Sequence, residues 1–268
     1  MQVEVVKPSF ASRGLNLPAI RSHALILRNV EVFETSLVVT MFTRALGKVS
    51  GLAKGGRRLK GPFSGGLDLL GLSDIVLLHK ASDALDLLTE AAPLERFTSL
   101  RCDLAALFAG YYVAELLTEL TDFHDPHPKL FDAAVVTLRH LGEPDSRDLR
   151  VLRFELACLR ELGSMPMLDE CAHCGAPIEA SGESFAFGLA TGGVLCPGCR
   201  PGQPHVATLS GRTLDALRIL AAPGSAWRGL DIRPAALSPV RVTLGAVISH
   251  LMGRRPRLLP YLGHGHGV

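Results

Sequence analysis

Cysteines are the residues of this chain best suited to chemistry, and four of the six form two tight pairs. The first pair is Cys171-Ala-His-Cys174, the second is Cys196-Pro-Gly-Cys199, and 21 residues separate them. One Cys-x-x-Cys turn presents two thiolates to an ion, and two such turns complete the tetrahedral sulfur shell that zinc prefers. The spacing therefore predicts one Zn²⁺ bound by Cys171, Cys174, Cys196 and Cys199.

A closed shell of four cysteines leaves no coordination position for water, so the predicted zinc has a structural role. A redox-active dithiol is the alternative for a single Cys-x-x-Cys, but two pairs at this spacing favour the metal. His173 and His205 are expected to be ordinary surface histidines, because four thiolates already suffice. Cys102 and Cys158 stand alone in apolar helical patterns.

The second chemical feature is a run of basic residues between positions 44 and 60 that contains no acidic residue. Such a run is typical of a solvated loop and also of a surface that binds nucleic-acid phosphates. Composition alone favours the solvated loop. The run consists of Arg44, Lys48, Lys54, Arg57, Arg58 and Lys60.

Aromatic residues flank this run, and a second basic group lies near the end of the chain. Phe42 and Phe63 are candidates for stacking on bases, although packing in a barrel core is at least as good an interpretation of Phe42. Arg254, Arg255 and Arg257 are equally typical of a nucleic-acid contact and of a solvated terminus.

The sequence contains no pattern that indicates a catalytic centre. It lacks a phosphate-binding loop, a serine nucleophile elbow and a two-histidine metalloprotease helix. Residues 122–127, Asp-Phe-His-Asp-Pro-His, superficially resemble a metal cluster, but Pro126 and Pro128 predict an ordinary turn. We therefore expect that the protein is not an enzyme.

Length and composition indicate a folded chain of about two domains. The 268 residues are 47% hydrophobic and 20% charged, which excludes a disordered chain. No uncharged apolar stretch approaches the ~18 residues of a membrane helix, and the N-terminus lacks the apolar core of a secretory signal. We expect a soluble, intracellular protein, and its net charge of +2 indicates no particular partner.

The secondary structure expected to position these residues changes along the chain from strands to helices. Short segments rich in Val, Leu, Ile and Thr, separated by turns such as Leu46-Gly47 and Ser82-Asp83, predict five strands and favour a small barrel of the OB type. The predicted strands are residues 23–33, 36–43, 48–55, 74–80 and 84–91. The glycine-rich residues 61–71 would form the long crossing connection, with a helix at 65–72 as the alternative.

Helical periodicity follows after Pro93. Apolar spacings of three and four predict helices over 100–120, 131–141 and 146–162. Beyond the cysteine block, Ser210 can cap a fourth helix, and Ser238-Pro239 can open a last one after a loop from Pro223 to Pro234.

We expect an α+β fold, an N-terminal OB-fold β barrel followed by an α-helical domain that carries an inserted Cys₄ zinc module. The predicted organisation is an N-terminal extension (1–21), the OB-fold domain (22–92), the helical domain (93–166), the zinc module (167–204), the resumed helical domain (205–258) and a tail (259–268). Residues 1–20 are expected to be an extended or mobile arm.

The order of these motifs resembles the bacterial RecO family of recombination mediators. The resemblance is carried by the barrel opening from Ala24 to Arg58, by HPKLFDAAVVTLRHL and RFELACLRELGSMPMLDECAHCG, and by SFAFGLATGGVLCPGC. It covers about residues 22–258, so the first 20 residues and the Gly/His-rich end lie outside it.

The resemblance implies a non-enzymatic mediator of the RecF/RecO/RecR pathway in the bacterial cytoplasm, associated with the nucleoid. Such proteins bind single- and double-stranded DNA, anneal strands, and work with RecR to load RecA onto DNA coated with single-stranded-DNA-binding protein (SSB). It favours DNA binding by the basic run and a pocket in the helical body for the acidic, apolar-ended SSB tail. Two alternatives stay open, a zinc-containing scaffold that binds only proteins and a nuclease whose active site is built from scattered residues.

Overall fold

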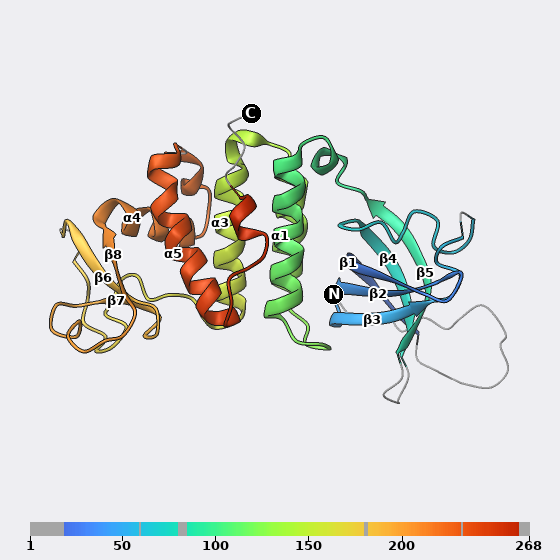
Figure 1. Ribbon diagram of the computed structural model, residues 1–268, viewed down its shortest axis with the longest axis horizontal. Helices are drawn as coiled ribbons and strands as arrows, with labels where there is room; N and C mark the ends of the chain where they lie inside the picture. Colours follow the sequence, from blue (N-terminus) through green and yellow to red (C-terminus); the bar gives the residue numbers. More distant parts are fainter. Residues whose placement is uncertain (1–18, 59, 80–84, 180–181, 232, 263–268) are drawn as a thin grey trace. The chain divides into compact units, whose positions relative to one another are not determined.

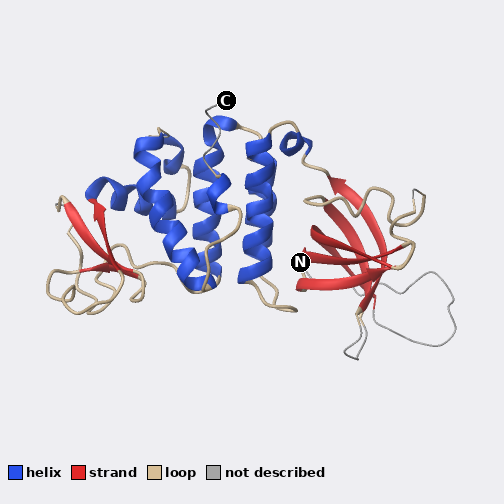
Figure 2. Cartoon of the chain, in the orientation of Figure 1, coloured by secondary structure: helices blue, strands red, loops and turns tan. Residues whose placement is uncertain are grey.

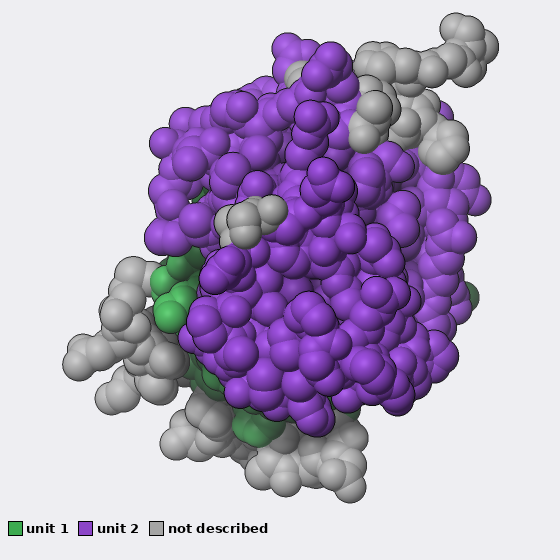
Figure 3. Space-filling model, turned by 90° about the vertical axis from the view of Figure 1, so that its left-hand side faces the viewer, with its two compact units in different colours: residues 1–101, 114–136 green, residues 102–113, 137–268 purple. Residues whose placement is uncertain are grey.

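A computed structural model of the chain describes residues 19–58, 60–79, 85–179, 182–231 and 233–262 (Figure 1). Two compact units make up the chain, Met1–Arg101 with Ala114–Val136, and Cys102–Val113 with Thr137–Val268 (Figure 3). The predicted arm up to residue 18, the Ser82-Asp83 turn and the Gly/His-rich end lie outside the described residues. Among the described helices, none combines the length and the apolar character needed to cross a membrane.

The first unit contains a β barrel, drawn as red arrows in Figure 2. The barrel is closed and has five strands in the order β1-β2-β3-β5-β4, in which β1 also pairs with β4. All neighbours are antiparallel except β3 and β5. This is the OB-like topology that the sequence predicts. The strands are β1 (Ala19–Val32), β2 (Ser36–Thr43), β3 (Gly47–Ala53), β4 (Leu72–Leu78) and β5 (Asp86–Glu95).

Alternation of apolar residues explains why these segments form strands. In β2, Leu37, Val39 and Met41 point into the barrel core, while the residues between them are half-buried. Successive side chains of a strand point to opposite faces, so one face fills the barrel and the other meets solvent or helices. The barrel strands extend three residues beyond the predicted range of 22–92 at each end, to Ala19 and Glu95.

The connection from β3 to β4 is a series of turns. The alternative of a helix at 65–72 is wrong, because these residues form turns that bond to β1: the Leu70 amide donates to the Ile26 carbonyl. Phe63 and Leu67 from this connection are buried in the barrel core. The glycine-rich tract therefore closes one part of the barrel instead of forming an element of its own.

Helices form most of the rest of the chain. They are α1 (Leu104–Leu120), α2 (Pro128–His140), α3 (Pro144–Glu161), α4 (Gly211–Ala221) and α5 (Pro234–Met252), with short 3-10 helices η1 (Thr98–Arg101), η2 (Ala226–Gly229) and η3 (Leu259–Tyr261). In the second unit, α3, α4 and α5 pack on one another. Two predicted helix-terminus signals are confirmed. Gly163 follows α3 with φ +68°, and the Ser210 hydroxyl accepts a hydrogen bond from the Thr213 amide at the start of α4.

The start of the last helix differs from the prediction. The first helical residue of α5 is Pro234, so Pro239 lies inside the helix and does not open it. Pro234 at the first helical position supplies the fixed φ that a helix start favours. The predicted loop from Pro223 to Pro234 also contains η2, whose Trp227 is buried.

The cysteine segment forms its own small sheet between α3 and α4, in the order β7-β6-β8. The strands are β6 (Ser184–Gly188), β7 (Gly193–Leu195) and β8 (Val206–Ser210). Phe187, Val194 and Leu209 supply its buried side chains. The sequence SFAFGL is a strand as expected, and the module is inserted in the helical body.

Candidate metal centre and nucleic-acid interface

The two Cys-x-x-Cys segments form tight backbone turns that aim their sulfurs at one point. The Gly175 amide donates to the Cys171 carbonyl at 2.8 Å, and the Cys199 amide donates to the Cys196 carbonyl at 3.0 Å. Gly175 has φ +72°, a conformation that favours glycine directly after the first pair. The Ala172 amide also donates to the Val194 carbonyl, which fixes the first turn to β7.

The four sulfurs lie within 4.8 Å of one another, and Cys174 Sγ is 3.8 Å from Cys196 Sγ. A tetrahedral shell with metal–sulfur bonds of ~2.3 Å separates its sulfurs by about 3.8 Å. Although Cys171 is buried, amides including that of Cys196 donate to its sulfur and lower the pKa of the thiol to about 6. Four thiolates so close would repel one another unless a cation neutralised them, so this arrangement suits a metal ion.

Among the described residues, these cysteines are the one group of three or more metal-ligating side chains close enough to hold an ion. His173 and His205 are exposed and are not part of that group, in agreement with the prediction. Four cysteines fill a tetrahedral shell, so the centre can stabilise the module but offers no position to a substrate.

Four residues of the basic run lie on the turns that follow β3. Lys54, Arg57, Arg58 and Lys60 are all exposed. Two consecutive turns shape this segment, since the Gly56 amide donates to the Ala53 carbonyl and the Arg58 amide donates to the Gly55 carbonyl. We call residues 54–60 the basic loop. It brings four positive side chains together on the surface of the barrel, and the described part of the loop carries no acidic residue.

Lys48 does not belong to this surface, so its assignment to DNA contacts is corrected, whereas the assignment of Arg44 stays a prediction. Arg44 donates two hydrogen bonds to the carboxylate of Asp132 on α2, at 2.9 and 3.0 Å. The Lys48 side chain is only 7% exposed, and its ammonium donates to the carbonyls of Thr118 and Thr121 at the end of α1. Burial lowers the pKa of Lys48, although Asp122 and Glu119 oppose this shift. Both residues join the barrel to α1 and α2.

The two predicted stacking residues are also buried, so that hypothesis is wrong. Phe42 has no exposed surface and packs near the ring of Phe131, with 6.3 Å between ring centroids. Phe63 is 5% exposed and belongs to the barrel core. Neither ring can reach a base without unfolding part of the barrel.

Comparison with known families gives the same order of domains as the structure. The family model described as recombination protein O N terminal matches residues 18–97, and the one described as recombination protein O C terminal matches residues 101–260. The chain belongs to the RecO family. The boundary between the two matches falls between β5 and α1, where the barrel ends and the helical part begins.

Relatives named DNA repair protein RecO match almost end to end. One from Rhodopirellula baltica is 41% identical, covering 89% of this chain and 97% of the relative. One from Anaeromyxobacter sp. is 36% identical over 88% and 92% of the two chains, and one from Dehalococcoides mccartyi is 28% identical over 90% and 94%. The chain is therefore a RecO-family protein over its barrel, its helical part and its cysteine module.

Two other sequence candidates in this RecO-family chain lie in the turn before α2 and in the segment after α5. Within residues 122–127, His127 pairs with Asp125 at 3.1 Å in an interhelical turn.

Of the C-terminal arginines, Arg255 is exposed and lines a pocket of about 390 Å³ on α5. The apolar walls of this pocket include Val242, Leu259 and Leu262. We call it the α5 pocket.

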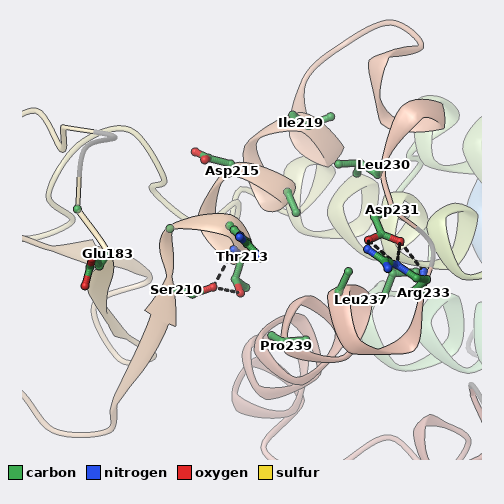
Figure 4. A pocket seen from close by; sticks show the side chains of 15 residues that line it. Glu183, Ser210, Thr213, Asp215, Ile219, Leu230, Asp231, Arg233, Leu237 and Pro239 are labelled. Carbon is green, nitrogen blue, oxygen red and sulfur yellow. Dashed lines mark hydrogen bonds and ion pairs between the residues drawn. The ribbon is translucent and has the colours of Figure 1, made fainter.

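A larger cavity of about 1070 Å³ lies between β8, α4 and α5 (Figure 4). Its lining carries three carboxylates, from Glu183, Asp215 and Asp231. Arg212 and Arg233 also line it, and the Arg233 guanidinium donates to Asp231 through bonds of 2.6 to 3.0 Å. Three carboxylates and two guanidinium groups thus line the cavity in this RecO-family chain, whereas the α5 pocket is lined by Arg241 and Arg255 and no carboxylate.

Proposed function

We propose that this protein is a non-enzymatic DNA-binding and strand-annealing mediator of the RecF/RecO/RecR pathway. In this role it binds single- and double-stranded DNA, works with RecR, and helps to load RecA onto SSB-coated single strands during DNA repair. It acts in the cytoplasm, at the nucleoid. The family membership supports this proposal, and the finer steps come from the resemblance to RecO mediators.

The observation that carries the proposal is the basic loop on the OB-like barrel. OB barrels bind single strands through one strand face and the flanking loops. Lys54, Arg58 and Lys60 are exposed and, among the described residues, none forms an ion pair with a carboxylate. Unpaired cations on an exposed loop can neutralise phosphates and release counterions at little desolvation cost.

We propose that the metal is a single zinc ion with a structural role. Thiolates are soft ligands that favour zinc over the hard cations magnesium and calcium, and the sulfur separation fits a tetrahedron. The ion would hold the two cysteine turns together beside β7. When bound, it supplies no reactive position, so it acts on DNA binding only through the stability of the module.

The α5 pocket is the better candidate for the SSB tail. An acidic, apolar-ended peptide needs an apolar floor and cations at the rim. The α5 pocket combines Leu259 and Leu262 with Arg241 and Arg255. Arg241 also pairs with Asp148, which does not line the pocket. The larger cavity is a poorer fit because three carboxylates in its lining would repel the acidic tail.

The decisive experiment is annealing of complementary strands coated with SSB. The variant K54A/R58A/K60A should anneal much more slowly and bind single strands more weakly. Each lost phosphate contact reduces the salt slope by ~0.7 for a single strand, so three contacts reduce it by about 2. The control K129A/R212A/R228A removes three exposed charges from α2, α4 and η2 and should keep the wild-type salt slope.

The same assay separates the two alternatives. A scaffold that binds only proteins would leave the annealing rate at the protein-free level. A nuclease would shorten end-labelled DNA in the presence of magnesium or manganese. The first result would overturn the annealing role, and the second would overturn the non-enzymatic role. An unchanged salt slope in K54A/R58A/K60A would overturn the proposed DNA-binding role of the basic loop.

A further inference from the structure

One aromatic side chain extends into solvent on the turn between β1 and β2. Phe33 is 85% exposed, which makes it the most exposed of the large apolar side chains that the structure describes. Single exposed apolar residues are common on protein surfaces and have no meaning by themselves. The position of Phe33 therefore has to be weighed with its backbone and its neighbours.

The backbone of Phe33 has φ +58°, in the left-handed region. Glycine and asparagine adopt this conformation readily, whereas a bulky residue rarely does. A turn selected only for folding would favour one of those smaller residues. Phe33 occupies this position with its ring in solvent, so packing within the fold gives no reason for a bulky residue there.

Phe33 is held beside the basic loop by Arg57. The Arg57 amide donates to the Thr35 carbonyl at 3.1 Å, and its guanidinium donates to the Glu34 carbonyl at 3.2 Å. The same guanidinium pairs with the Glu31 carboxylate at 3.1 Å. These bonds tie the β1–β2 turn to the segment that carries Lys54, Arg58 and Lys60, so the ring and the cations lie on two turns that are bonded to each other.

Two carboxylates lie near Phe33, one at the end of β1 and one in the turn. Glu31 is matched by Arg57, and Glu34 is exposed. The basic loop contributes four positive charges, so the surface formed by the turn and the basic loop has a net positive charge. It offers an aromatic face and positive charge side by side, which is the pairing that single-stranded nucleic acid requires.

We propose that Phe33 stacks on an unpaired base of single-stranded DNA while the basic loop holds the neighbouring phosphates. This inference rests on the proposed DNA-binding function and names the base-contacting residue of that site. Stacking needs an accessible base face, which a single strand offers and a duplex hides. Phe33 therefore makes the surface prefer single strands, whereas Lys54, Arg58 and Lys60 attract both forms of DNA.

The test compares F33A with K54A/R58A/K60A on a labelled single strand and on a duplex of the same sequence. Loss of one base–aromatic stack should weaken single-strand binding by at least about fivefold. Duplex affinity and the salt slope should stay at wild-type values in F33A, because no phosphate contact is removed. K54A/R58A/K60A should instead lose affinity for both DNA forms and show the smaller salt slope.

Two further variants exclude a loss of folding. F33G relieves the left-handed backbone and should lose single-strand affinity as F33A does, at equal or higher Tm. F33W should retain affinity, and its indole fluorescence should fall when single strands are added. The chain has one native tryptophan, Trp227, so the wild-type protein gives the background signal.

The outcomes separate the inference from the proposed function. Normal single-strand affinity in F33A, with the loss seen in K54A/R58A/K60A, would overturn the stacking role and leave the proposed function intact. If F33A lost equal affinity for single strands and for duplex, the stacking role would also be overturned. The same holds if F33A bound DNA normally but no longer bound SSB. If neither variant changed DNA binding, the basic loop itself would be the wrong surface.

Discussion

Tyr112 on α1 donates a 2.8 Å hydrogen bond to Glu155 on α3, and neither side chain has any exposed surface. The second carboxylate oxygen, Glu155 Oε2, has no hydrogen-bond partner among the described residues. Burial raises the pKa of Glu155 to about 7, although the charge of Arg241 and the bond from Tyr112 oppose the shift. The second unit thus contains a buried acid that changes charge close to neutral pH.

Replacement of Glu155 by glutamine should remove part of the pH dependence of stability. Because the folded-state pKa lies above the ordinary value of 4.5, folding favours the protonated acid. The wild-type protein therefore loses stability as pH rises from about 4.5 to about 7, by up to about 3 kcal/mol. The glutamine amide keeps an acceptor for Tyr112 and does not ionise, so E155Q should be increasingly more stable than wild type over this range.

Urea unfolding of both proteins at pH 5 and pH 8 measures this difference. The other ionisable groups near Glu155 are Tyr112, Cys158, Asp148 and Arg241, and all are present in both proteins. E170Q, at an exposed carboxylate, serves as the control. A stability gap between E155Q and wild type that is the same at both pH values would contradict the expected ionisation.

Elemental analysis should find one zinc per chain, bound by the four clustered cysteines. C196S should lose the metal and unfold at a lower temperature, because structural zinc contributes directly to folding. C102S removes a cysteine outside the cluster and should keep both the metal and the Tm. Metal-free wild-type protein with an unchanged Tm would count against a structural centre.

Replacement of Lys48 should lower stability, whereas replacement of Lys54 should change DNA binding. K48M leaves the carbonyls of Thr118 and Thr121 without their buried donor and should cost about 1–3 kcal/mol of unfolding free energy. K54M, at an exposed position, should change stability by less than ~0.5 kcal/mol but reduce the salt slope of single-strand binding by ~0.7. Chemical denaturation and a salt titration measure the two effects, and a reduced salt slope in K48M would return Lys48 to the DNA surface.

Charge reversal in the α5 pocket should weaken binding of an SSB-tail peptide. R255E places a carboxylate beside the acidic peptide and should raise its Kd about tenfold or more. R233E makes the same charge change in the larger cavity and should leave the Kd unchanged. Fluorescence anisotropy of a labelled peptide measures both, and equal affinities in R255E and wild type would remove this pocket from consideration.

The sequence predicts those features that depend on local spacing. The strands follow from alternation, and the metal ligands follow from two Cys-x-x-Cys turns whose backbone bonds are local. The burial of Lys48 could not be predicted, because its partners Thr118 and Thr121 lie about 70 residues away. Phe42 and Phe63 are indicated as stacking residues because they flank the basic run in the sequence. The exposed ring instead belongs to Phe33, whose turn is bonded to the basic loop through Arg57.

The start of α5 also could not be chosen from local sequence signals alone. Ser238-Pro239 is a reasonable opening signal, yet α5 begins at Pro234, because a second proline upstream satisfies the same rule. Only the packing of the early residues, such as buried Leu237, distinguishes the two starts. Local rules thus indicate that a helix begins in this region without choosing between two equivalent signals.

Closure of the barrel through the β1–β4 pairing has a consequence for how this protein can be recruited. A sheet with free edges can gain a strand from another chain, which leads to β-augmentation or to aggregation when many copies are crowded together. Here every strand of the barrel is paired on both sides. A partner of the barrel would therefore be bound through surface side chains, each of which a point mutation can alter individually.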